Sequence, residues 1–129
     1  MTSERDMQLR AIRPGLELQT EKSCETEKFQ SETLRPILKF QNGIILAQFK
    51  KYIEKFKPQF NAYNQSAQKN YIEDAMKKDV RIKNSLIACT VSMMTLEEYE
   101  FYCANKNELN KRIVAMVIER IKDQVVMLY

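Results

Sequence analysis

Apolar residues between positions 23 and 57 recur at the spacing of an α-helix. Steps of three, four and seven residues keep them on one face of a helix. The stripe consists of Leu34, Leu38, Ile45, Phe49, Tyr52 and Phe56. Because this register continues through Pro36 and Gly43, the pattern predicts one long helix that is kinked near Pro36. The helix is expected to end at Lys57, since a residue that precedes proline avoids the helical region.

Two further helices are predicted in the middle of the chain. Residues 66–78 carry a second apolar face at helical spacing. Asp79 is expected to be the N-cap of a third helix, because an aspartate side chain accepts hydrogen bonds from the free N–H groups of a first turn. That helix is predicted over residues 80–94, where apolar side chains cover more than half of the helical wheel.

The last third of the chain carries clear helix-start signals. Thr95 and Glu98 have the spacing of a capping box, which predicts a short helix that ends at about Ala104. Asn107 is expected to cap a final helix over residues 108–127, whose apolar positions share one wide arc.

The helical patterns together predict an all-α fold. No segment alternates between apolar and polar residues with the period of two that marks a strand. We expect residues 23–129 to form one domain, an irregular bundle of four or five helices around the long kinked N-terminal helix. Residues 1–22 are polar, are interrupted at Pro14-Gly15 and balance their charges, so we expect a loose N-terminal arm that can contain one short ordered segment.

Composition removes several classes of function. The 129 residues include two glycines and no histidine, which excludes glycine-rich nucleotide loops and removes the usual general base and metal ligand. The three cysteines form no CxxC motif, so neither a disulfide scaffold nor a cysteine-based zinc site is expected. No apolar stretch has the length of a membrane span. We therefore expect a cytoplasmic chain without metal or cofactor, and the missing histidine weighs against an enzyme.

The whole chain carries a net charge of +4, and its basic residues are concentrated in the middle of the sequence. A predicted basic face is formed by Lys50, Lys51, Lys55, Lys77 and Lys78. Aromatic residues interleave with these lysines, and rings beside cations can bind nucleic acid. However, Tyr52 and Phe56 belong to the core stripe, and no nucleic-acid-binding motif is present. A solvated face is therefore favoured over a nucleic-acid partner.

Four polar residues lie within apolar faces and are the candidates for a ligand site or for an interface. They are Gln41, Asn42, Arg120 and Gln124. Asn42 falls in the stripe itself, where an amide can bond a freed backbone carbonyl, fix the register of a helix interface or hold a small ligand. Arg120 lies in the apolar arc of the last helix, where it needs a carboxylate, must extend to solvent or could hold an anion.

Four stretches between about Glu25 and Gln124 are distinctive: TEKFQSETLRPILKFQNGIILAQFKKYIEK, YIEDAMKKDVRIKNSL, LEEYEFY and LNKRIVAMVIERIKDQ. Together they resemble a family of small helical bacterial proteins of unknown function, some of which are labelled glyoxalases. A metal-dependent glyoxalase needs histidine and glutamate ligands on a β-rich scaffold, and this chain has no histidine and no predicted strand. The resemblance therefore supports the helical prediction and carries over no site residue.

These observations favour a non-enzymatic interaction or scaffold module that works through its helix faces. We expect it to self-associate as a homodimer, because the stripe of the long helix exceeds what the rest of the monomer is expected to cover, and to bind a protein partner. One alternative is an enzyme or small-anion binder that uses carboxylate, arginine and lysine groups in a helical cavity. The other is a weak nucleic-acid binder that uses the middle basic face.

Overall fold

The computed structural model describes residues 3–13 and 25–128, and these residues are almost entirely helical. In chain order the elements are α1 (Glu4–Ile12), α2 (Glu25–Phe29), the π-helical turn η1 (Gln30–Leu34), α3 (Arg35–Phe40), α4 (Asn42–Phe56), the 3₁₀ turn η2 (Pro58–Ala62), α5 (Gln65–Lys78), α6 (Val80–Val91), α7 (Leu96–Ala104), α8 (Lys106–Asp123) and the 3₁₀ turn η3 (Val125–Leu128). No strand occurs within the described ranges, so the predicted all-α class is confirmed.

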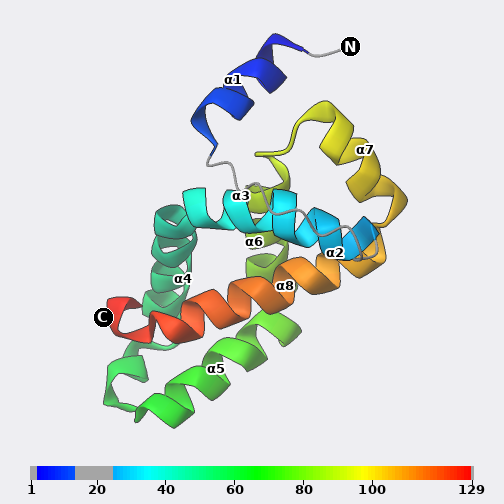
Figure 1. The fold of residues 1–129 in the computed structure, drawn as a ribbon. Helices are drawn as coiled ribbons and strands as arrows, with labels where there is room; N and C mark the ends of the chain where they lie inside the picture. The colour runs from blue at the N-terminus through cyan, green and yellow to red at the C-terminus, as the bar shows by residue number, and fades with distance from the viewer. Residues whose placement is uncertain (1–2, 14–24, 129) are drawn as a thin grey trace.

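The segment predicted as one long helix changes direction at Gln41. Figure 1 shows α2, η1 and α3 as one run, whereas α4 leaves that run at a steep angle. The predicted kink near Pro36 is wrong in position. The π-helical turn widens the helix just before Pro36, where the proline ring would otherwise clash with the carbonyl four residues earlier. The backbone of Gln41, at φ −88° and ψ 4°, then makes the turn between α3 and α4.

The core lies where α8 crosses the other helices. In Figure 1 α8 runs beside α5 and beneath the α2–α3 run, and it also packs against α6 and α7. Leu109, Ile113 and Val117 of α8 are fully buried. The stripe of the first helical run enters the same core, where its first four residues are buried and Tyr52 is half-buried. Phe56, at the end of α4, is 41% exposed and is therefore not part of the core.

Two of the predicted helix starts are confirmed and one is wrong. The side chain of Asp79 accepts a hydrogen bond from the Arg81 N–H at the start of α6. Thr95 and Glu98 form both bonds of the capping box at the start of α7. Asn107, in contrast, lies inside α8. The carbonyl of Asn105 already accepts the first bond of that helix, from the Leu109 N–H at 2.9 Å.

The predicted N-terminal arm contains a docked helix, α1, while residues 14–24 lie outside the described part of the chain. Polar side chains fasten α1 to the turn before α7. The carboxylate of Asp6 accepts the Leu96 N–H at 3.0 and 3.1 Å. The guanidinium of Arg13 donates to both carboxylate oxygens of Glu98, at 2.6 and 2.7 Å. Only Asp6 and Leu9 of α1 are buried, so polar contacts dominate this docking.

Candidate binding groove between α5, α6 and α8

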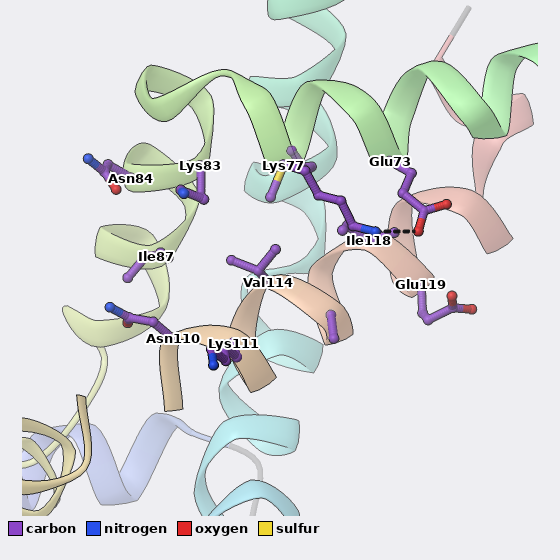
Figure 2. Close-up of a pocket in the computed structure, with 12 residues that line it drawn as sticks. Glu73, Lys77, Lys83, Asn84, Ile87, Asn110, Lys111, Val114, Ile118 and Glu119 are labelled. Carbon is purple, nitrogen blue, oxygen red and sulfur yellow. Dashed lines mark hydrogen bonds and ion pairs between the residues drawn. The ribbon is translucent and has the colours of Figure 1, made fainter. Parts of the chain in front are cut away.

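A groove of about 570 Å³ lies between α5, α6 and α8. Its floor is apolar and is formed by Met76 of α5, Ile87 of α6, and Val114 and Ile118 of α8. Figure 2 shows Ile87, Val114 and Ile118 between the three helices, with polar side chains at both ends of the groove. Met76 and Ile118 are buried, whereas Ile87 and Val114 are half-buried and so are accessible from the groove.

Helical periodicity explains why each wall of the groove combines apolar and charged groups. Residues three or four positions apart lie on the same face of a helix. On α5 this spacing joins Glu73 to Met76 and Lys77, and on α6 it joins Lys83 to Ile87. On α8 the same spacing places Asn110, Val114 and Ile118 in one row, with Lys111 and Glu119 beside it.

The two ends of the groove differ in charge. Figure 2 places Lys83 and Lys111 at one end and Glu73 and Glu119 at the other. Glu73 is already paired, because Lys77 bonds it at 2.9 Å and Lys122 bonds it at 3.0 Å. These hydrogen bonds, that of Lys77 first, lower the pKa of Glu73 below its ordinary value. In the described part of the chain, neither Lys83 nor Lys111 has an ion-pair partner.

Asn110 lines the lysine end of the groove, and its side chain is oriented by a hydrogen bond from Tyr102 of α7. Its side-chain oxygen accepts a hydrogen bond from the hydroxyl of Tyr102 at 2.6 Å. This bond fixes the orientation of the Asn110 amide, so that its NH₂ group remains a donor for a ligand in the groove. The lysine end therefore offers two ammonium groups and one oriented amide to an anionic or acceptor group.

The amide groups predicted from the sequence as ligand or register candidates are satisfied within the chain. Asn42 and Gln124 form a reciprocal amide pair, with N–H···O distances of 2.8 and 2.9 Å. The same Gln124 NH₂ group reaches the Arg120 carbonyl at 3.0 Å. The side chain of Gln41 donates to the carbonyl of Cys89 at 3.1 Å. This arrangement favours the structural interpretation, in which the amides join α4 to the end of α8 and to α6.

Arg120 has no carboxylate partner among residues 3–13 and 25–128. Its side chain is half-buried on α8. Desolvation of the guanidinium lowers its pKa from the ordinary value, and the nearby charge of Arg35 lowers it further. Of the interpretations left open by the sequence, the carboxylate pair is therefore not seen in this part of the chain.

The five lysines of the predicted basic face do not form one continuous surface. Lys77 lines the groove beside Glu73. Lys78 lines a separate hollow with Tyr71 and Asp79, and Lys55 lies over the ring of Phe56. The remaining two, Lys50 and Lys51, belong to α4, and the ammonium of Lys51 pairs with Glu54.

Sequence reasoning missed the groove because its residues come from three helices. The row formed by Asn110, Val114 and Ile118 is visible on a helical wheel, but the wheel does not show what lies opposite it.

Comparison with family models, with curated proteins and with solved structures found no match to this chain. Within residues 3–13 and 25–128 no cluster of acidic and cysteine side chains has the composition of a metal site. None of the helices in those ranges combines the length and the apolar sequence that crossing a membrane requires.

Proposed function

We propose that the chain is a protein-interaction module whose α5–α6–α8 groove binds one amphipathic helix of a partner protein. The supporting observation is an open groove of about 570 Å³ with an apolar floor and, at one end, two lysines that form no ion pair within residues 3–13 and 25–128. A helix that lies in such a groove fills it with side chains spaced three and four residues apart. This is a sharper form of the interaction module that the sequence favours.

The walls of the groove favour a helix over an extended strand. A strand binds by adding to the edge of a sheet, where unpaired backbone N–H and C=O groups are available. All three walls here are helices, whose central backbone groups are bonded within the helix. Binding must therefore come from side chains, and from Lys111 to Glu119 the wall formed by α8 is about 12 Å long at 1.5 Å per residue. This length matches two to three turns of a partner helix.

The charges also give the bound helix a direction. Acidic side chains, and the negative C-terminal end of a helix dipole, are stabilised near the free ammonium groups of Lys83 and Lys111. The N-terminal end of the partner is stabilised near the carboxylate of Glu119. The partner helix therefore lies antiparallel to α8, whose earlier residue, Lys111, is at the lysine end.

A site-specific cross-linking experiment tests this proposal in the cells that produce the chain. A photoreactive amino acid replaces Ala115, an exposed residue that lines the groove. The matched control places it at Ala104, which is equally exposed at the end of α7. We expect position 115, and not position 104, to capture a partner segment that is helical and has acidic residues in its C-terminal half. Equal capture at both positions would overturn the proposal.

The captured segment is then synthesised as a peptide, and its affinity is measured by fluorescence anisotropy. The double substitution Lys83→Glu/Lys111→Glu is expected to weaken binding at least tenfold, because each loss of a charged contact in a partly desolvated site costs on the order of 1 kcal/mol or more. The matched charge reversal Lys50→Glu/Lys51→Glu, on α4, is expected to leave the affinity unchanged. Loss of affinity in both double variants would refute the assignment to the groove.

The same experiment separates a foreign partner from a second copy of the chain. The homodimer predicted from the sequence assumed a stripe that the monomer leaves uncovered. Of the six stripe residues, only Phe56 is mainly outside the core. Capture of this chain's own peptides at position 115 would assign the groove to self-association. Sedimentation of the purified protein would then show a dimer that the Lys83→Glu/Lys111→Glu variant does not form.

A further inference from the structure

Two lysine-rich segments that are distant in the sequence meet at one place on the surface. Residues 50–57 and 77–83 each contain four basic side chains and one acidic side chain. The hydroxyl of Tyr52 in the first segment bonds the Asp79 carboxylate in the second at 2.8 Å. The guanidinium carbon of Arg81 lies 4.8 Å from the ring centroid of Phe56. The end of α4 therefore packs against the junction of α5 and α6.

Aromatic rings and cations alternate over this junction, which we name the aromatic–cation face. Its members are Tyr52, Lys55, Phe56, Lys57, Tyr71 and Arg81. The Phe56 ring has Lys55 on one side, at 5.2 Å from its centroid, as well as Arg81. The ammonium of Lys57 lies 5.9 Å from the centroid of Tyr71. A hollow of about 380 Å³ adjoins them, lined by Tyr52, Tyr71 and Arg81 among others.

The exposure of Phe56 changes the argument made from the sequence. The stripe assigned this ring to the core, where it would be inaccessible to a ligand. The structure leaves it 41% exposed, with Lys55 and Arg81 beside the ring and the Tyr52 ring tilted against it at a centroid distance of 4.9 Å. Full burial of this ring would contribute to folding, so its partial exposure forgoes part of that free energy. A ligand that stacks on the Phe56 ring removes this apolar surface from water and so gains the free energy that folding forgoes.

Two carboxylates line the hollow, those of the exposed Asp74 and of Asp79, and Asp79 does not repel an anion as a free carboxylate would. Asp79 bonds Arg81 through both of its oxygens, at 3.3 and 3.2 Å, and it also accepts the Tyr52 hydroxyl. Hydrogen bonds from Arg81 and then from Tyr52 lower the pKa of Asp79 to about 2, so that it remains the anion that anchors Arg81. Lys55 and Lys57 pair with no carboxylate in the described part of the chain, although the Lys57 ammonium also lies 5.4 Å from the Tyr63 ring centroid, so both can meet an external negative charge.

We propose that the aromatic–cation face binds single-stranded nucleic acid, with a base stacked on Phe56 and the neighbouring phosphates held by Lys55 and Lys57. Proteins that bind single strands without sequence preference combine these two features, because every base has a π-face and every nucleotide carries a phosphate. A duplex keeps its bases stacked inside and would leave the ring without a partner. An acidic peptide would use the lysines but has no need of the ring.

Fluorescence anisotropy with labelled 12-residue oligo(dT) and oligo(U) tests the proposal. We expect Phe56→Leu to weaken binding by about tenfold, since stacking on one aromatic side chain has about that effect, and Phe56→Trp to preserve it. Leucine keeps the apolar contact without the ring, so loss of fold does not explain a difference between the two variants. Phe40→Leu, at a phenylalanine of α3 that is 44% exposed, is the matched control and is expected to bind normally.

The dependence on salt tests the phosphate contacts separately. The slope of log affinity against log salt concentration is expected to become shallower by about 1.4 in Lys55→Gln/Lys57→Gln, since each phosphate contact to a single strand contributes about 0.7. Charge reversal of the groove, Lys83→Glu/Lys111→Glu, is expected to keep the difference between the Phe56 variants. The groove and the aromatic–cation face therefore fail or succeed independently.

Three results would overturn the proposal. One is an equal affinity of Phe56→Leu and Phe56→Trp for the oligonucleotides. Another is binding to a 12-base-pair duplex that is as tight as binding to the single strands. The third is binding to phosphatidylserine vesicles that depends on Phe56 when the oligonucleotides do not bind, which would assign the face to an anionic membrane instead.

Discussion

Replacement of Arg13 by alanine tests how α1 is held on the rest of the fold. The guanidinium donates two hydrogen bonds to Glu98 and a third, at 3.1 Å, to the Met93 carbonyl. The side chains of Arg13 and Glu98 are only 11% and 18% exposed. The pair is therefore largely shielded from water. Ion pairs that are exposed to water contribute little to stability, but this limit does not apply here.

The free energy lost in the Arg13→Ala protein can be estimated from the other contacts that hold α1 and Glu98. Burial of Leu9, the one buried apolar residue of α1, contributes roughly 1.5–3 kcal/mol. Removing one partner from a shielded, hydrogen-bonded ion pair costs up to about 3–5 kcal/mol. Glu98 keeps the hydroxyl of Thr33 at 3.1 Å and the Thr95 N–H at 2.8 Å, so we expect a loss of about 2–3 kcal/mol. At about 1.4 kcal/mol per tenfold change, this is a roughly 30- to 150-fold increase in the opening of α1.

Native-state hydrogen exchange measures this opening directly. In the Arg13→Ala protein, the amides of α1 are expected to exchange about 30- to 150-fold faster, while those of α8 in the core change little. Arg10→Ala is the matched control, because Arg10 approaches Glu97 only to 3.9 Å and both side chains are exposed. An equal effect of the two substitutions, or unchanged protection of α1 in Arg13→Ala, would refute the argument that this pair fastens the helix.

Three further predictions concern stability. Gly43→Ala is expected to raise the free energy of unfolding by about 0.4–1 kcal/mol in urea titrations, because, apart from its chain neighbours and the adjacent backbone of its own helix, no described atom lies within 4 Å of the added Cβ. Asn42→Ala removes the donor to the side-chain oxygen of the half-buried Gln124 and leaves its NH₂ group only the Arg120 carbonyl, so it is expected to cost about 1 kcal/mol, whereas the double variant Asn42→Leu/Gln124→Leu costs less than two such losses. Burial opposes ionisation of Glu98, but hydrogen bonds from Arg13 and the Thr95 N–H outweigh it and lower the pKa below 4.5. Ionised Glu98 therefore stabilises the fold above pH 4.5. As the pH is lowered through the pKa of Glu98 in the folded protein, the melting temperature is expected to fall, and to fall less steeply in the Glu98→Gln variant.

Features that depend on neighbouring residues were predictable from the sequence. The capping box of Thr95 and Glu98 is formed within one helical turn, and Asp79 caps α6 through a residue two positions away. The all-α class follows in the same way from local periodicity. The turn at Gln41 was not predictable, because it reflects the packing of α3 and α4 on other helices. Pro36 gave the stronger local signal, but the π-helical turn before it accommodates the ring.

The candidate surfaces were less accessible to sequence reasoning for a geometric reason. Periodicity shows that Phe56 shares a helix face with Phe49. It does not show that the packed helices cover the Phe49 ring but leave the Phe56 ring, at the end of α4, partly exposed. The lysines were grouped by their positions in the chain, whereas helical geometry separates neighbours by about 100°. Lys77 consequently faces Glu73 in the groove, while Lys78 faces Tyr71 in the adjoining hollow.

The two proposed surfaces share one structural support, the junction of α5 and α6. Asp79 is the C-cap of α5 and the N-cap of α6, and its carboxylate accepts the Tyr52 hydroxyl of α4, so it links the three helices. A substitution at Asp79 would therefore disturb both surfaces and could not distinguish their functions. Lys77 and Lys78 can, because Lys77 lines the groove whereas Lys78 lines the hollow that adjoins the aromatic–cation face. A variant that changes only one of them alters one surface and leaves the common support in place.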